Sequence, residues 1–130
     1  MKKLTLAVVQ FTPEFGKKQK NLSRMHQLVE GVTADIIVFP ELCTTGYFFQ
    51  SRAEVAKSAE TVDGPASKFF RDMARSKNAV VVAGFAERHQ KYLYNACLVV
   101  VPEIKTPYVY RKTHLFYKEK ACFDSGDTCF

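Results

Sequence analysis

The 130-residue sequence has no tryptophan, few glycines and prolines, and only four cysteines. The low glycine and proline contents exclude a collagen-like repeat and a low-complexity linker. The cysteines follow irregular spacings without a C-x-x-C pair, unlike a zinc site or a small disulfide framework, so we expect reduced thiols and no metal. Their positions are Cys43, Cys97, Cys122 and Cys129.

Long apolar runs are also missing. The stretch from Leu4 to Val9 follows two lysines, as the apolar region of an export signal does, but Gln10 ends it after six residues. An export signal needs roughly 7–15 apolar residues, and a membrane helix needs about 20. The sequence therefore predicts a soluble, cytoplasmic protein without a membrane partner.

The sequence has fewer acidic than basic residues: 13 Asp and Glu compared with 19 Lys and Arg, which gives a net charge of +6. A basic protein binds nucleic acid through a dense basic stripe interleaved with aromatic residues. Here the basic residues are scattered, with loose groups at Lys17–Lys20 and Arg111–Lys120. We expect no nucleic-acid partner and interpret the charge as a solvated surface.

The sequence does contain enough apolar material for one core, since 47% of its residues are hydrophobic and 25% are charged. A chain of this length forms one domain and buries about two-thirds of its surface on folding. Apolar periodicity and turn residues divide it into five strands and two helices. In chain order we expect strand 4–11, a helix between Asn21 and Gly31, strand 35–39, helix 65–78, and strands 79–85, 92–101 and 108–111.

Local signals define the ends of these elements. Asn21 is placed to cap the first helix, and Pro65 occupies the first turn of the second. A polar turn, Glu87–Lys91, separates the third and fourth strands. The strands Ile36–Phe39 and Ala79–Ala83 are apolar on both faces, which is typical of a sheet covered on both sides.

Two helices can cover only one face of a five-stranded sheet. The sequence therefore predicts an α/β fold in which a mixed β-sheet has its helices on one face. The opposite face requires a second layer, and we expect this chain to be incomplete by itself.

Glu41 follows the strand 35–39, which Pro40 ends. Ligands of α/β sheets bind at the carboxyl edge of the strands. Desolvation between apolar neighbours would raise the pKa of a carboxyl group at this edge and suit it to general base catalysis. The alternative is a turn or capping glutamate.

Lys112 likewise follows a strand, 108–111, and Glu119 comes shortly after it. A lysine at this edge can stabilise a developing oxyanion. The alternative is a surface lysine whose alkyl chain covers apolar surface. His114 and Cys122 lie eight residues apart, which is not a recognisable spacing for a nucleophile and its base.

Five segments of the chain stand out as a set: Leu6–Gln10, Ala34–Tyr47, Asp63–Pro65, Tyr94–Ala96 and Tyr110–Leu115. Taken together, they resemble the nitrilase superfamily of carbon–nitrogen hydrolases over nearly the whole chain. The segments around Glu119 and Gly126 are most similar to the amidase and N-carbamoyl amidohydrolase branches.

The resemblance implies an α-β-β-α sandwich of about twice this length and a Cys-Glu-Lys mechanism without a cofactor. By motif, Glu41 matches the general base, Lys112 the lysine that stabilises the tetrahedral intermediate, and Glu119 a second glutamate that orients the lysine. A cysteine thiol attacks the amide carbon, and water then hydrolyses the thioester. The implied substrates are small non-peptide amides or N-carbamoyl amides, and the implied assembly is a homo-oligomer.

The nucleophilic cysteine of the family ends the strand that follows the lysine motif, and none of the four cysteines occupies that place; Cys129 comes nearest. We therefore expect residues 1–130 to be the N-terminal portion of a single hydrolase domain and to be inactive alone. The competing hypothesis is a non-catalytic, truncated relative that acts in binding or assembly.

Overall fold

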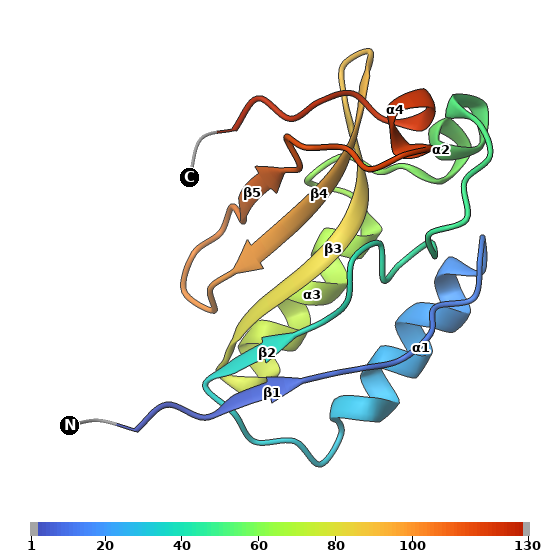
Figure 1. Ribbon diagram of the computed structural model, residues 1–130. Helices are drawn as coiled ribbons and strands as arrows, with labels where there is room; N and C mark the ends of the chain where they lie inside the picture. Colours follow the sequence, from blue (N-terminus) through green and yellow to red (C-terminus); the bar gives the residue numbers. More distant parts are fainter. Residues whose placement is uncertain (1–2, 129–130) are drawn as a thin grey trace.

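A mixed five-stranded sheet forms the centre of the computed structural model, which describes residues 3–128 (Figure 1). Strands β1, β2 and β3 are parallel, whereas β4 is antiparallel to both β3 and β5. The sheet order follows the chain order, and the predicted α/β fold with a mixed sheet is confirmed. The strands are β1 (Leu6–Val8), β2 (Ile36–Val38), β3 (Val80–His89), β4 (Tyr92–Val100) and β5 (Tyr108–Arg111).

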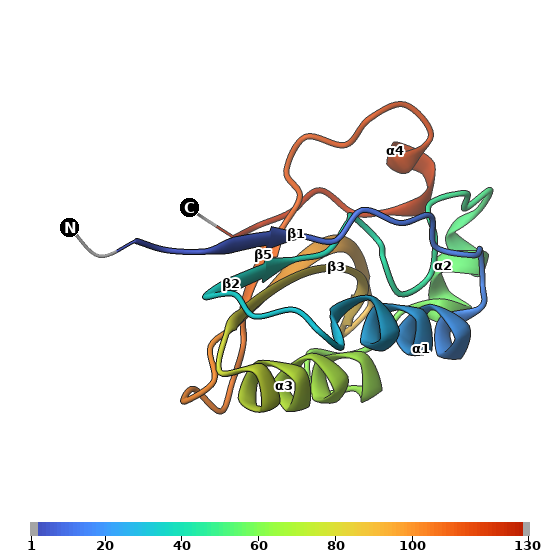
Figure 2. The ribbon, with the colours of Figure 1, turned by 90° about the horizontal axis from the view of Figure 1, so that it is seen from below.

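The two long helices, α1 (Lys18–Val29) and α3 (Pro65–Lys77), lie on the same face of the sheet (Figure 2). Two short helices, α2 (Arg52–Ser58) and α4 (Glu119–Cys122), contact each other at one end of it. None of these helices, within residues 3–128, combines the length and the apolar character needed to cross a membrane.

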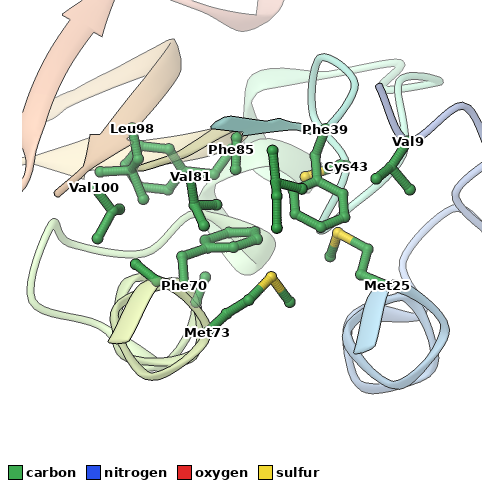
Figure 3. Close-up of a cluster of buried hydrophobic side chains, with 14 of the residues drawn as sticks. Val9, Met25, Phe39, Cys43, Phe70, Met73, Val81, Phe85, Leu98 and Val100 are labelled. Carbon is green, nitrogen blue, oxygen red and sulfur yellow. The ribbon is translucent and has the colours of Figure 1, made fainter. Parts of the chain in front are cut away.

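The core fills the space between the sheet and the long helices (Figure 3). Met25 of α1 and Phe70 of α3 are completely buried in this core, which also contains strand residues such as Leu98. Burial of a large apolar side chain contributes about 1.5–3 kcal/mol, so this interface accounts for much of the stability of the fold.

The opposite face of the sheet is open. Because strand side chains alternate between faces, the neighbours of the core residues point away from the helices. Leu6 and Val8 of β1 are 59% and 67% exposed, and Tyr108 of β5 is 60% exposed. Neither α1 nor α3 lies on this side (Figure 2), so the expected placement of the long helices on one face is confirmed.

The prediction that Asn21 caps the first helix is wrong. The helix begins at Lys18, and Asn21 is buried inside it. Its side-chain amide donates to the carbonyls of Glu14 and Thr44, and its Oδ1 accepts from the Glu14 N–H. Asn21 therefore ties α1 to two loops, a long-range role that local sequence signals do not reveal.

Other boundaries also differ from the prediction. Strands β1 and β2 have only three residues each, and β3 continues to His89 through much of the predicted polar turn. The turn is short because Gln90 adopts a left-handed conformation, with φ 54°, and reverses the chain directly. Helices α2 and α4 were not predicted. The prediction for α3 is confirmed, since it begins at Pro65.

Candidate active site

Three strand ends meet at one edge of the sheet. Strand β5 is antiparallel to β4, which is antiparallel to β3, so β2, β3 and β5 all run in one direction. Their carboxyl ends therefore lie along the same edge. Glu41 follows β2, and Lys112 follows β5, so the topology brings these two side chains together although 71 positions separate them.

Gly84 of β3 allows the turn that contains Glu41 to cross close to the sheet. A Cβ atom at Gly84 would lie 2.6 Å from the Cα of Glu41 and 2.6 Å from the backbone nitrogen of Leu42. The Gly84 carbonyl accepts from the Cys43 N–H at 3.0 Å, and its own N–H donates to the Pro40 carbonyl at 3.3 Å. This close backbone approach requires glycine and fixes the position of Glu41.

The residue after Glu41 adopts an unusual backbone conformation. Leu42 has a φ of 47°, in the left-handed region that residues with a side chain rarely adopt. Its side chain is completely buried, and its carbonyl accepts from the N–H groups of Thr45 and Gly46. Burial and hydrogen bonding thus offset the local strain and keep the turn in one shape.

The backbone of Lys112 is held from two sides. Its N–H donates to the Asn95 carbonyl of β4 at 2.9 Å, and its carbonyl accepts from the Gly126 N–H at 2.9 Å. A Cβ atom at Gly126 would overlap the Arg111 carbonyl, so the returning chain also needs glycine here. These contacts extend the sheet beyond β5 and aim the lysine side chain toward Glu41.

The preceding residue, Arg111, points to the other face of the sheet. Its guanidinium forms two hydrogen bonds of 2.7 Å with the buried carboxylate of Glu87 and lies over the ring of Tyr94. Paired geometry of this kind fixes both partners. Arg111 and Lys112 therefore have different roles: Arg111 holds the strand, and Lys112 reaches the site.

Glu119 is the first residue of α4 and is almost fully buried. Its carboxylate accepts from the Phe116 N–H at 2.7 Å, while its own N–H donates to the Phe116 carbonyl at 2.9 Å. This reciprocal pair closes the turn after Lys112 and directs the Glu119 carboxylate to the end of β5.

Lys112 bridges the two carboxylates. Its Nζ lies 2.9 Å from Oε1 of Glu41 and 2.9 Å from Oε2 of Glu119. The side-chain nitrogen of Asn95 lies between the same two groups, 2.5 Å from Oε1 of Glu41 and 2.6 Å from Oε1 of Glu119. The structure thus brings together all three residues that the sequence singled out.

Electrostatics fix the charge of this cluster. Burial alone would lower the pKa of Lys112, but its hydrogen bonds to Glu41 and Glu119 raise that pKa well above the ordinary lysine value. Burial would raise the pKa of Glu119, but hydrogen bonds from Lys112, the Phe116 N–H and Asn95 lower it. The lysine therefore stays a cation and Glu119 an anion at neutral pH.

One expectation about Glu41 is not met in these 130 residues. The sequence predicts a carboxylate desolvated between apolar neighbours, yet the Glu41 side chain is 45% exposed, compared with 4% for Glu119. The reason is that Glu41 faces the side of the sheet that neither α1 nor α3 covers (Figure 2). Desolvation would require a layer on that side.

Asn95 is the site residue that sequence reasoning missed. The segment Tyr94–Ala96 supports the family resemblance, but it gave no role to this side chain. The feature that could have indicated its role is a single amide in an otherwise apolar strand. In the structure this amide is buried, since Asn95 is 3% exposed. A buried amide needs hydrogen-bond partners, and here the partners are the two carboxylates.

None of the three described cysteines has the environment of a nucleophile. Burial raises the pKa of the thiols of Cys43, Cys97 and Cys122. Cys43 and Cys122 are buried and lie near the carbonyls of Gly84 and Phe49. No hydrogen bond within residues 3–128 joins a thiol to Glu41 or Lys112, and Cys129 lies outside the described residues.

Cys97 differs from the other two described cysteines, which are buried. It is partly exposed, because it lies on the open face of β4, two residues from Asn95. It lines a depression of about 460 Å³ whose other walls include Glu41, Gly84 and Lys112. The two remaining thiols lie away from this depression.

A second, smaller cavity adjoins the site. It has a volume of about 250 Å³ and is lined mainly by aromatic side chains that include Tyr47, Phe116 and Tyr117, and also by Glu119. Burial and the negative charges of Glu119 and Glu41 raise the pKa of the Tyr47 hydroxyl. No group of three or more potential metal ligands exists among residues 3–128.

Known proteins of one family are similar to this chain. Residues 5–130 match the family model described as carbon-nitrogen hydrolase. The chain is 38% identical to a nitrilase from Pyrococcus abyssi over 96% of this chain and 49% of the relative. It is 34% identical to an (R)-stereoselective amidase from a Pseudomonas species over 95% of this chain and 45% of the relative.

A solved structure shows the same fold. The crystal structure of a protein from Xanthomonas campestris, described as a member of the CN-hydrolase superfamily, superimposes with a TM-score of 0.87 at 24% identity. The match covers 98% of this chain and 48% of that protein. The chain thus spans about half the length of the relatives that it matches.

Proposed function

The chain belongs to the carbon–nitrogen hydrolase family, and on this premise we propose that it supplies the glutamate–lysine part of a Cys-Glu-Lys hydrolase site. The observation that supports the proposal most directly is the hydrogen-bonded group of Glu41, Lys112 and Glu119 at the carboxyl edge of the sheet. The substrates proposed are small non-peptide amides or N-carbamoyl amides.

In this proposal Glu41 is the general base. It removes the proton from a cysteine thiol, and the thiolate attacks the amide carbon. The C–N bond then breaks, the amine leaves with a proton returned by Glu41, and an acyl thioester remains. Glu41 next takes a proton from water, which attacks the thioester carbon. The C–S bond breaks, the carboxylic acid leaves, and the sulfur takes back the proton from Glu41 as a thiol.

Lys112 stabilises the negative oxygen of the tetrahedral intermediate, since its raised pKa keeps the ammonium charged at neutral pH. Glu119 orients Lys112 through the 2.9 Å contact between Oε2 and Nζ. Glu119 is buried and both its oxygens accept hydrogen bonds, which suits a positioning role. Glu41 is the more exposed carboxylate and the one that can reach a substrate.

We further propose that the nucleophilic cysteine lies outside the 130 residues, on the portion of the relatives that this chain does not cover. Residues 1–130 are then the N-terminal portion of one domain, inactive alone. A second layer on the open face would also desolvate Glu41. The assembly proposed for the whole protein is a cytoplasmic homo-oligomer.

The test starts with the intact mass of the protein as its source makes it, followed by assays against simple amides and N-carbamoyl amides. In the whole protein, Glu41→Gln and Lys112→Ala should each lower kcat/KM by about 10²–10⁴. Glu103→Gln and Lys105→Ala change the same residue types at exposed positions and should leave the rate unchanged.

Two outcomes would contradict parts of this proposal. Amide hydrolysis by residues 1–130 alone, lost on Glu41→Gln, would show that the nucleophile lies within the chain, and serine variants of the four cysteines, made one at a time, would identify it. A native protein of only 130 residues without hydrolase activity would instead favour the non-catalytic role in binding or assembly.

A further inference from the structure

Asn95 touches every member of the glutamate–lysine group. Its carbonyl accepts from the Lys112 N–H, and its side-chain nitrogen donates to Glu41 and to Glu119. A carboxamide nitrogen has two hydrogens, so each hydrogen serves one carboxylate. The side chain extends from the central part of β4 and is 3% exposed, which fixes its direction.

The charge of the cluster explains why a neutral donor is needed. Two carboxylates face a single ammonium group, and like charges at this separation repel each other. A second cation between Glu41 and Glu119 would compete with Lys112 for both partners. An amide offsets the repulsion with two hydrogen bonds and adds no charge.

The hydrogen bonds also distinguish the two glutamates. On Glu119, Oε1 accepts from Asn95, while Oε2 accepts from Lys112 and from the Phe116 N–H. On Glu41, the bonds from Asn95 and Lys112 both end on Oε1. Within residues 3–128, Oε2 of Glu41 therefore accepts no hydrogen bond from the protein.

We infer that Asn95 is a positioning residue, which sets the spacing of the two carboxylates around Lys112 and turns Oε2 of Glu41 toward the open depression. The geometric part of this inference stands on the contacts alone, and its catalytic meaning rests on the proposed function. Oε2 of Glu41 is then the oxygen that receives the proton of the nucleophile, whereas both carboxylate oxygens of Glu119 already accept hydrogen bonds.

The first test is a titration that needs no activity. In the 130-residue protein, the carboxyl carbons of Glu119 and Glu41 are followed by NMR against pH. Asn95→Ala removes both donors, so the Glu119 titration should move to higher pH than in the unchanged protein. Asn95→Asp keeps the side-chain volume and should produce the same direction of shift, which covers the case in which Asn95→Ala fails to fold.

Asn21→Ala is the matched control. Asn21 is another buried asparagine with several hydrogen bonds, but its partners are backbone groups of Glu14 and Thr44, and none of these bonds involves Glu119 or Lys112. Its loss should lower stability without moving the Glu119 titration. If neither Asn95 variant moves that titration relative to the Asn21 variant, the positioning role is refuted.

The second test uses the whole protein. Asn95→Ala should lower kcat about 10–100-fold, change KM by less than about threefold and shift the acidic limb of the pH–rate profile, since a base that is only misplaced loses turnover rather than substrate binding. A rise in KM alone would overturn the catalytic meaning. If no amide is hydrolysed while the Glu119 titration still shifts, the proposed function fails and the geometric role of Asn95 stands.

Discussion

The two faces of the sheet use the same strands for different purposes. On the helix-covered face, Ile37, Val81 and Leu98 are completely buried against α1 and α3. On the other face, Leu6 and Val8 are more than half exposed. Alternation of side chains along each strand separates the two sets.

The difference shows where stability and chemistry are located. The covered face is packed around a continuous cluster of apolar side chains. The open face carries the depression with Glu41, Asn95 and Lys112 at one edge. A change on the covered face should therefore act on folding, and a change on the open face should act on the site. Four predictions test this division.

The largest effect is expected in the core. Phe70→Ala removes a completely buried ring from the interface between α3 and the sheet, and should lower the free energy of unfolding by about 3–5 kcal/mol. Tyr108→Ala removes a ring of similar size from the open face, where it is 60% exposed, and should cost less than about 1 kcal/mol. Urea denaturation measures both, and equal losses would contradict the division between the faces.

A smaller loss is expected at the close approach beside Glu41. Gly84→Ala places a methyl group 2.6 Å from the Cα of Glu41, so the turn must move, at a cost of about 1–3 kcal/mol. Gly31→Ala is the control, because no atom lies within 4 Å of the added carbon. Amide chemical shifts should change around Glu41 in the first variant only. A fully native stability for Gly84→Ala would show that glycine is not required there.

The third prediction concerns pH. The pKa of Glu119 is lowered in the folded protein, so its carboxylate adds stability above the ordinary glutamate pKa of about 4.3, and this contribution disappears as the pH falls through the lower, folded value. Glu119→Gln should therefore reduce the dependence of Tm on pH in the acid range. The pKa values of Asp124 and Asp127 are lowered as well, so part of the dependence remains.

The control for this experiment is Glu103→Gln, which changes an exposed glutamate. Its profile of Tm against pH should follow that of the unchanged protein. If the profile of Tm against pH for Glu119→Gln also coincided with that of the unchanged protein, Glu119 would not be stabilised as an anion by this cluster.

The sequence predicts the features that depend on local pattern. Strands apolar on both faces, the helix that begins at Pro65, and the positions of Glu41 and Lys112 after strands all follow from short-range signals. Topology then brings the two strand ends to a common edge. The family resemblance adds Glu119, which no local pattern distinguishes from an ordinary loop glutamate.

The missed features depend on distant partners. Glycine is needed at position 84 only because the turn at Glu41, 43 positions earlier in the chain, passes close to the Cα of Gly84. Asn21 and Asn95 acquire their roles only when loops and carboxylates from elsewhere reach them. Buried polar groups are thus the part of this fold that the amino-acid pattern describes least well, because their partners are set by tertiary structure.

The smallest change in stability is expected on the open face of β1. Val8→Thr keeps a β-branched side chain at a position that is 67% exposed, so the free energy of unfolding should change by less than about 0.5 kcal/mol. Ile37→Thr makes the same kind of change in β2 at a completely buried position and should cost several times more.

Self-association is the second property in which Val8→Thr and Ile37→Thr should differ. A broad exposed apolar face favours association of copies, so Val8→Thr should weaken it in sedimentation experiments, whereas Ile37→Thr should act only through unfolding. If Val8→Thr destabilised the monomer as much as Ile37→Thr, then β1 would be covered on both sides. The division into a covered and an open face would then fail at β1, and with it the reason to expect a second layer over this part of the sheet.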